Sequence, residues 1–397
     1  MNNNIRGKKL LIQGAGRGNL GLLKVAKLNG VYTIVTSMKG DYPCIPLADT
    51  VCFTDITDTD AILQVARAKN VDGVAICCID TGLKGVGRCC DVLGLRGISE
   101  NAAIVANDKY LMKECLVKAG VRTAQFCKVR NALELSDVAN NIGYPVIVKA
   151  TDLQGSRGIT IVRNERQLLS AFQDSMYQTK KDYCIIEEYI DGKEYGVQAF
   201  VYDGKVLFVL PHGDETMMCK TAVPIGHYMP YKMSRELYED TCFQVKNAIK
   251  AINFNNCAVN VDLIEREGKA YIIELTARVG ANALPELTSN YFGINYYEMI
   301  LTMALGESPL EIFNKRTPPC ATYARVIRFD RNGIIKSISV PQLEDTEIHM
   351  FVHEGSEVRE FTNCNDAIGE IIVKGKDLFE CQNKLATALS AIKIELL

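Results

Sequence analysis

Two acidic residues in otherwise apolar stretches are the first candidates for chemistry. Asp262 lies in "NVDLI" and Glu274 in "IIELT", and the turn "EREGK" separates the two stretches. Both stretches have strand character, so we expect the acids on adjacent antiparallel strands. An acid in an apolar strand is costly to bury without a cation partner. The pair therefore predicts a hard-cation site, typically Mg²⁺ shared with phosphates, with Mn²⁺ as an alternative ion.

Arg278 follows Glu274 by four residues. Its guanidinium could neutralise the charge on a phosphoryl group during transfer. The alternative is that Arg278 is only the salt-bridge partner of Asp262 and Glu274.

A glycine hairpin is the second feature with chemical potential. In "PVIVKATDLQGSRGITIV", Lys149 ends one β-branched run, and Gly155 to Gly158 form a loop before a second run. Such a hairpin can fold over a triphosphate, using backbone N–H groups, the Ser156 hydroxyl and the Arg157 charge. A flexible hairpin without a ligand is the alternative.

Carboxylates also gather in "IIEEYIDGKEYGVQ", at Glu187, Glu188 and Glu194, around a turn at Asp191-Gly192. Carboxylates accept hydrogen bonds from ribose hydroxyls or an adenine amino group. Solvated surface charges are the alternative interpretation.

The turn "GAGRGNLG" follows an expected strand and opens an expected helix. It is similar to a dinucleotide-binding fingerprint, which expects an acid about 20 residues further on, at the end of the second strand. That strand ends "TIVTS", and Asp41 comes late. A tight strand–helix turn is therefore the favoured interpretation, and an NAD-dependent oxidoreductase is disfavoured.

The elements that must position these residues follow from the hydrophobic pattern. Residues 7–103 alternate strands and helices, which predicts a parallel sheet. The following segment mixes hairpins with helices, as in α+β folds. After about residue 310, "RTPPC" is expected to be a linker, followed by strands and one helix.

Length and composition limit the number of domains and the class of protein. At 397 residues we expect two to four domains, and the net charge of −2 without a long basic run gives no nucleic-acid footprint. No apolar stretch approaches the ~18 residues of a membrane helix, so we expect a cytoplasmic protein with no membrane partner. The fifteen cysteines lack a Cys-x-x-Cys motif and are expected to be buried free thiols. Neither they nor the four histidines show the spacing of metal ligands.

Taken in order, the motifs resemble those of the ATP-grasp superfamily. The similarity is greatest to carboxylate–amine ligases, phosphoribosylamine–glycine ligase, biotin carboxylase and carbamoyl-phosphate synthetase. It covers about residues 8–310, and the tail more loosely. The resemblance implies a parallel α/β, Rossmann-like pre-ATP-grasp domain (1–103), an ATP-grasp domain of two α+β subdomains (104–310, with a mobile lid subdomain at about 121–190), and a small C-terminal α+β region (311–397).

The same resemblance implies roles for individual residues. Lys109 of "NDK" would contact the α-phosphate of ATP, and Lys149 of "PVIVKA" would contact phosphate and adenine. Asp262 and Glu274 match the Mg²⁺ carboxylates, and Arg278 matches the catalytic arginine of an "E-x-N-x-R" motif. The remaining nucleotide contacts would come from the loop residues Gly155, Ser156, Arg157 and Gly158, from Glu187, Glu188, Tyr189 and Ile190 near adenine, and from Glu194 on ribose.

Thr276 is a departure from the family pattern, which usually has an asparagine two residues after the second metal acid. A hydroxyl can still coordinate, but more weakly. On the acceptor side, "HGDETMMCKTAVPIGHYMPY" carries His212, Lys220 and His227 in a region that faces substrate in related ligases. Each could bind a carboxylate or act as a base, and an ordered loop with incidental polar groups is the alternative.

The resemblance implies an ATP-dependent enzyme, a carboxylate–amine ligase. It would convert a small carboxylate into an acyl phosphate and join it to an amine, with release of ADP and phosphate. A bicarbonate-phosphorylating carboxylase and a non-catalytic nucleotide-binding protein are the alternatives, although no "MKM"-type biotin site is present. Dimers are common among such enzymes, so a homodimer is compatible with the resemblance.

Overall fold

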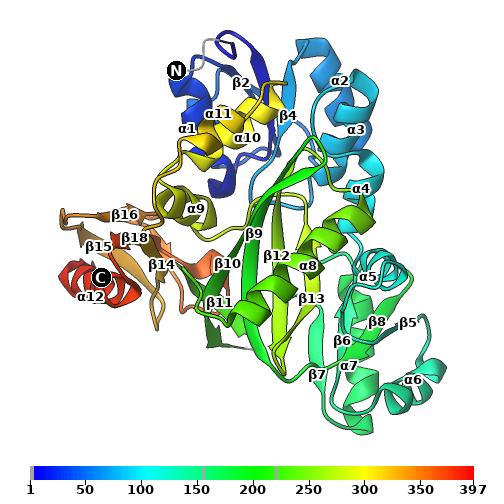
Figure 1. Ribbon diagram of the computed structural model, residues 1–397. Helices are drawn as coiled ribbons and strands as arrows, with labels where there is room; N and C mark the ends of the chain where they lie inside the picture. Colours follow the sequence, from blue (N-terminus) through cyan, green and yellow to red (C-terminus); the bar gives the residue numbers. More distant parts are fainter. Residues whose placement is uncertain (1–3, 154–156, 220–221) are drawn as a thin grey trace. The chain divides into compact units, whose positions relative to one another are not determined.

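The computed structural model describes residues 4–153, 157–219 and 222–397 (Figure 1). The chain divides into two compact units, each built from several segments. The first unit is 1–210, 233–280 and 297–314, and the second is 211–232, 281–296 and 315–397. The domain boundaries predicted at residues 103 and 310 stay a prediction.

A parallel sheet opens the first unit, with strand order β3-β2-β1-β4. Leu10, Leu11 and Ile12 in its central strand are fully buried, as expected when helices cover both faces of a parallel sheet. This confirms the predicted parallel α/β region. The elements are β1 (Lys9–Gln13), β2 (Tyr32–Ser37), β3 (Thr50–Phe53) and β4 (Gly73–Ala75), with α1 (Leu20–Leu28), α2 (Thr59–Lys69), α3 (Leu83–Leu93) and α4 (Glu100–Ala106).

A four-stranded antiparallel sheet, ordered β5-β8-β6-β7, follows in the first unit. Val146, Val148, Cys184 and Ile186 alternate along two of its strands and bury one face in a core with α6 and α7. The other face is left for Lys149 and the residues opposite it. The elements are α5 (Lys109–Lys118), β5 (Phe126–Val129), α6 (Leu135–Ile142), β6 (Val146–Ala150), β7 (Ile159–Val162), α7 (Leu168–Gln178) and β8 (Cys184–Glu188).

The rest of the first unit is built on antiparallel strands in the order β13-β12-β9-β10. The long helix α8 packs against β13 (Figure 1), and the Ser234 hydroxyl accepts a hydrogen bond from the backbone N–H of Leu237 to begin it. The elements are β9 (Lys193–Tyr202), β10 (Lys205–Met218, which continues into the second unit), α8 (Arg235–Ile252), β12 (Cys257–Arg266), β13 (Lys269–Thr276), α10 (Tyr296–Ala304) and α11 (Leu310–Asn314).

The second unit contains strands in the order β10-β11-β14-β18-β16 and a smaller sheet, β17-β15-β19. Helix α12 packs on β14 and β18 through Cys381, Leu385 and Ala388. The elements are β11 (Ala222–Met229), α9 (Leu284–Phe292), β14 (Ala321–Ile327), β15 (Gly333–Ser339), β16 (Thr346–Met350), β17 (Glu357–Val358), β18 (Gly369–Gly375), α12 (Leu378–Ala391) and β19 (Lys393–Leu396). Short 3₁₀ helices in the two units are η1 (Arg17–Asn19), η2 (Ile45–Leu47), η3 (Ala132–Glu134), η4 (Glu165–Gln167) and η5 (Cys364–Asp366).

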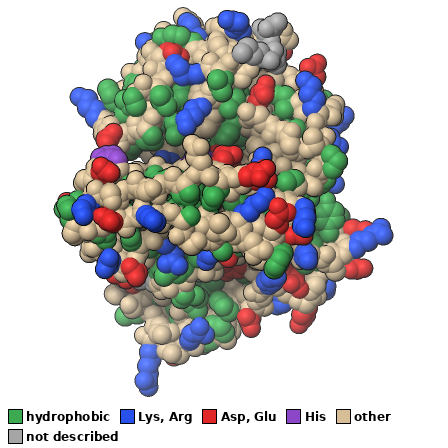
Figure 2. Space-filling model, turned by 90° about the vertical axis from the view of Figure 1, so that its left-hand side faces the viewer, with side chains coloured by type: hydrophobic (Ala, Val, Ile, Leu, Met, Phe, Trp, Pro, Cys, Tyr) green, Lys and Arg blue, Asp and Glu red, His purple; other side chains and the backbone are tan. Residues whose placement is uncertain are grey.

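Two surface properties are relevant to function. Acidic and basic side chains are interspersed on the face shown in Figure 2, which therefore presents no broad field of one sign. Among the described residues, we find no helix with both the length and the apolar character needed to cross a membrane.

Candidate active site

Two lysines and one glutamate form a buried ion cluster on the inner face of the β5-β8-β6-β7 sheet. Register places Glu187 of β8 opposite Ile147, two residues before Lys149 on β6. The Glu187 carboxylate forms ion pairs with Lys149 and with Lys113 of α5, the latter at 3.0 Å between Nζ and Oε2. Burial raises the pKa of Glu187, but the two ammonium groups outweigh burial and hold this pKa below its usual range. The Glu187 side chain thus fixes two lysines in place.

Lys109 lies at the first position of α5, and a helix cap positions it. Asp108 accepts hydrogen bonds from the backbone N–H groups of Tyr110 and Leu111 at 3.0 and 3.3 Å. The Lys109 ammonium donates to the backbone carbonyl oxygen of Leu153 at 2.8 Å and pairs with Glu274 Oε1 at 2.9 Å. Burial lowers the pKa of Lys109, but Glu274 outweighs burial and keeps this pKa above its ordinary value. Lys109 therefore remains a cation.

The two predicted metal acids face each other across a strand pair. Asp262 of β12 is directly opposite Glu274 of β13, and a β-bulge follows immediately after Asp262. Asp262 is exposed and Glu274 is partly exposed, so neither acid is sealed in the core. Two carboxylates side by side, with access to solvent, supply the oxygen ligands that Mg²⁺ prefers. The residues present therefore fit this ion.

A short polar network supports Asp262. The side-chain amide of Asn260 donates to Asp262 Oδ1 at 3.1 Å, and its Oδ1 accepts from Gln198 Nε2 at 2.6 Å. Gln198 Oε1 in turn accepts from the backbone N–H of Gly280 at 3.0 Å. Because these residues sit on neighbouring strands, the network ties the orientation of Asp262 to the sheet.

Arg278 has a partner that the sequence analysis did not identify. Its Nε and Nη2 donate to the two carboxylate oxygens of Asp80, each at 2.7 Å, and the Thr276 hydroxyl also donates to Asp80 Oδ1. Burial raises the pKa of Asp80, but Arg278 and Thr276 outweigh it and hold this pKa below its usual range. Arg278 thus forms a salt bridge with Asp80, and its predicted role toward a phosphoryl group stays a prediction.

The glycine hairpin is described only at its two ends. Lys149 and Ile159 are paired, so both flanks are strands as predicted. The Gly158 carbonyl oxygen accepts hydrogen bonds from the Ala150 backbone N–H and the Ser175 hydroxyl, each at 2.9 Å. Arg157 is exposed. Gly155 and Ser156 lie outside the described residues.

The segment after β8 carries the other predicted nucleotide contacts. Glu188 pairs with Arg266 at 2.5 Å, and its backbone N–H donates to the Gln125 carbonyl oxygen at 2.8 Å. Tyr189 donates its backbone N–H to the Pro145 carbonyl oxygen at 3.3 Å. Ile190 is buried, whereas Glu194 is exposed on β9. Glu188, Tyr189 and Ile190 directly follow Glu187 at the end of β8, whereas Glu194 lies on β9. Their roles toward adenine and ribose stay predictions.

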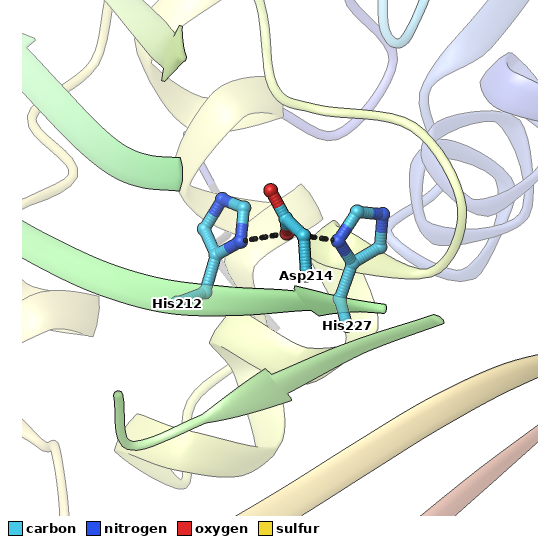
Figure 3. A group of neighbouring side chains, drawn as sticks. All are labelled: His212, Asp214 and His227. Carbon is cyan, nitrogen blue, oxygen red and sulfur yellow. Dashed lines mark hydrogen bonds and ion pairs between the residues drawn. The ribbon is translucent and has the colours of Figure 1, made fainter. Parts of the chain in front are cut away.

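The predicted acceptor residues lie in the second unit. His212 and His227 converge on Asp214, a residue that the sequence analysis passed over (Figure 3). Asp214 Oδ1 is 2.9 Å from His212 Nδ1 and 2.6 Å from His227 Nδ1. Lys220 lies outside the described residues.

Packing explains two glycines of the first glycine-rich turn, Gly18 and Gly21. A Cβ at Gly18 would lie 2.5 Å from the Cβ of Cys78, and one at Gly21 would lie 2.3 Å from the ring of Tyr297. Asn19 closes the turn by donating to the carbonyl oxygens of Gln13 and Gly14 at 2.8 and 2.9 Å. Close approach within the fold is therefore sufficient to account for these glycines.

The residues that sequence reasoning missed carried weak signals. Lys113 follows Lys109 by one helical turn, which places both on the same helix face. Asp80 follows shortly after a buried parallel strand, at the sheet edge where ligands bind in open α/β folds. Asn260 alternates with Asp262 along a strand and so shares its face.

The fold combines a parallel α/β region with antiparallel sheets. With its lysines, paired carboxylates and arginine, it defines an ATP-grasp protein. Residues 108–312 match the family described as "Carbamoyl-phosphate synthase L chain, ATP binding domain", and the chain belongs to that family.

Solved structures extend the similarity over the whole chain. Phosphoribosylglycinamide synthetase from Anaerococcus prevotii is 47% identical with a TM-score of 0.87, covering 98% of this chain and 100% of that one. L-amino acid ligase from Bacillus licheniformis shares the fold, with a TM-score of 0.83, 18% identity and 99% of each chain covered.

A curated relative matches over a shorter span. The C-terminal section of the carbamoyl phosphate synthase large chain from Aquifex aeolicus (strain VF5) is 25% identical over 215 residues. The match covers 52% of this chain and 38% of that relative, so this chain corresponds to well under two thirds of the relative's length.

Proposed function

We propose that the protein is an ADP-forming ATP-grasp ligase that activates a small carboxylate and joins it to an amine, most simply that of an amino acid. The observation that carries this proposal is the charge arrangement in the first unit. Three cationic side chains, Lys109, Lys149 and Arg278, are each held by an acid, beside the in-register pair Asp262 and Glu274. Cations and metal-binding carboxylates in one site suit a polyphosphate.

In this proposal the residues divide into ligand contacts and positioning groups. Lys109 and Lys149 bind phosphate oxygens, while Asp262 and Glu274 hold Mg²⁺, with Thr276 as a weaker neighbour of the ion. Mg²⁺, when bound, neutralises phosphate charge. Glu187 acts as a positioning residue, because its carboxylate pairs with Lys149 and Lys113 and its side chain is buried. Arg278 is freed from Asp80 as phosphoryl charge replaces that carboxylate.

The proposed reaction then proceeds in two steps. A carboxylate oxygen of the substrate bonds to the γ-phosphorus as the bond from that phosphorus to the bridging β–γ oxygen breaks, and ADP leaves. The amine, having lost its ammonium proton, attacks the acyl carbon. The C–O bond to phosphate breaks as the C–N bond forms, and the nitrogen gives up one more proton, which the departing phosphate takes. Phosphate therefore leaves with one oxygen of the original acid.

Two of the similar structures bear names consistent with this class, a phosphoribosylglycinamide synthetase and an L-amino acid ligase. The roles predicted for His212 and His227, binding a carboxylate or acting as a base, stay predictions that this reaction does not require. Their Nδ1 atoms both face Asp214.

Isotope tracing tests the proposal. The full chain would be screened with ATP, Mg²⁺, amino acids and small carboxylates, and product masses and ADP would be measured. With the productive acid labelled by heavy oxygen, one labelled oxygen atom should appear in inorganic phosphate.

Two outcomes would reject the assignment, and a third would favour the non-catalytic alternative. AMP with pyrophosphate would indicate adenylation instead of phosphoryl transfer. Unlabelled phosphate during confirmed amide formation would exclude the acyl phosphate. Nucleotide binding without any turnover across the screen would favour the non-catalytic alternative.

A further inference from the structure

The histidine–aspartate cluster of the second unit is built on one face of a two-stranded hairpin (Figure 3). Asp214 of β10 is directly opposite His227 of β11. His212 precedes Asp214 by two residues on β10, and residues two apart on a strand share a face. The hairpin therefore brings all three side chains together without help from a flexible loop.

The cluster combines buried imidazoles with a carboxylate that solvent can reach. The side chains of His212 and His227 are 2% and 6% exposed, and that of Asp214 is 19% exposed. Asp214 therefore keeps partial access to solvent between two buried imidazoles.

We propose that His212, Asp214 and His227 form a binding site for a divalent first-row transition metal ion such as Zn²⁺. One candidate ligand atom from each residue lies within 4.8 Å of the others. Imidazole nitrogen suits Zn²⁺, Co²⁺, Ni²⁺ and Fe²⁺, whereas Mg²⁺ prefers an all-oxygen shell. Three protein ligands leave at least one position for water or another small ligand. This proposal does not depend on the proposed ligase reaction.

The observed distances indicate how far the hairpin must adjust. Zn²⁺ bonds of about 2.0–2.1 Å in a tetrahedral shell place ligand atoms roughly 3.3 Å apart. The two Nδ1 atoms are 2.9 and 2.6 Å from Asp214 Oδ1, which are hydrogen-bond distances. Side chains that open by several tenths of an ångström would replace two hydrogen bonds by one ion. Each neutral ring would then carry its proton on Nε2.

The cysteines dictate the choice of probe. The chain has fifteen cysteines, and thiolates bind Zn²⁺ well. Co²⁺ separates the two ligand types, because thiolate ligands add an intense charge-transfer band that nitrogen and oxygen ligands lack. The metal-free full chain, kept reduced and in excess Mg²⁺, would be titrated with Co²⁺ and then with Zn²⁺ as a displacing ion.

Wild type should bind one Co²⁺ with visible d–d bands and no thiolate band at this first equivalent, and Zn²⁺ should displace it. Asp214→Asn and His227→Asn should each weaken binding at least ~100-fold, since losing a direct ligand exceeds the ~10–100-fold cost of losing an outer partner. His353→Gln is the matched control, because it removes an exposed imidazole of the same unit and should leave binding unchanged.

A wild-type spectrum that shows only thiolate ligation would overturn the proposal, whatever the variants do. Equal Co²⁺ affinity in wild type and His227→Asn, with both folded by circular dichroism, would overturn it as well. A further check uses wild type alone. Zn²⁺ should raise the melting temperature in excess Mg²⁺, and no rise would contradict a site formed by the folded hairpin.

Discussion

The two units solve the problem of a buried acid in different ways. In the first unit, Glu187 and Asp80 are each matched by permanently charged lysine or arginine side chains. In the second unit, Asp214 is matched by two imidazoles. Ammonium and guanidinium groups suit phosphate oxygens, whereas imidazole nitrogen suits transition metals and proton transfer. The contrast supports the two proposals, a polyphosphate in the first unit and a small metal cation in the second.

The largest loss of activity is expected when one of the two carboxylates proposed to hold Mg²⁺ is removed. Glu274→Gln and Asp262→Asn each delete a charge with little change in shape. We expect at least a ~100-fold loss of ADP formation, because charge stabilisation at the phosphates is lost. The measurement is steady-state ADP release with the productive substrates.

Glu265→Gln on the same hairpin is the control for these two variants, since Glu265 is paired opposite Ala270 and lies outside the carboxylate pair. Its turnover should stay near wild type. Turnover near wild type in both Glu274→Gln and Asp262→Asn would exclude the metal assignment.

Breaking the ion pair between Asp80 and Arg278 should destabilise the first unit. Arg278→Met leaves Asp80 buried without its cation, and breaking one side of a buried pair costs about 3–5 kcal/mol. Urea unfolding should show a loss of this size. The double variant Asp80→Asn/Arg278→Met should regain part of it, and a double variant no more stable than Arg278→Met would contradict the pairing.

The dependence of stability on pH should reveal the contribution of Glu187. Its pKa is lower in the folded protein than its ordinary value, so its pairing stabilises the fold above the ordinary carboxyl range, about 4.3. That contribution is lost as pH falls from this range toward the folded-state pKa. Because Glu187→Gln leaves two buried lysines without their anion, it should reduce the free energy of unfolding at pH 7 by about 3–5 kcal/mol.

In the same variant, the free energy of unfolding should also decrease less steeply than in wild type as the pH falls. Urea midpoints measured from neutral pH down through the carboxyl range would show the change. An identical acid profile in wild type and Glu187→Gln would count against a lowered pKa at this residue.

The smallest effect is expected at Thr276. Thr276→Asn restores the residue usual in the family and removes one hydroxyl donor to Asp80. We expect less than a ~10-fold change in ADP formation, because charged partners of Asp80 remain and charged hydrogen bonds dominate such pairs. A complete loss of ADP formation would point to direct contact between Thr276 and substrate.

The parts of the site that depend on local pattern were predictable from sequence. Two apolar strands joined by a short turn place Asp262 opposite Glu274, and this register is observed. The β-branched runs around Lys149 also formed the expected strand pair. Such features require only alternation and turn chemistry.

The remaining parts depend on pairing across long stretches of chain. Arg278 and its partner Asp80 are 198 residues apart, and nothing in either local sequence specifies the other. Likewise, the pairing of the Glu187 carboxylate with Lys113 is set by how α5 packs, which the local sequence does not specify. The role of Glu187 near adenine, which the family resemblance implies, stays a prediction.

The fork between Asp80 and Arg278 also has a consequence for ligand selection. The Asp80 carboxylate binds one edge of the guanidinium with both of its oxygens, so it competes with anions from solution at the high effective concentration that an intramolecular contact provides. A lone phosphate or sulfate ion from solution must displace it with no other gain. A nucleotide offsets this cost because it also contacts Lys109 and Lys149. We therefore expect the ligand-free protein to bind small anions more weakly than it would with an unpaired arginine.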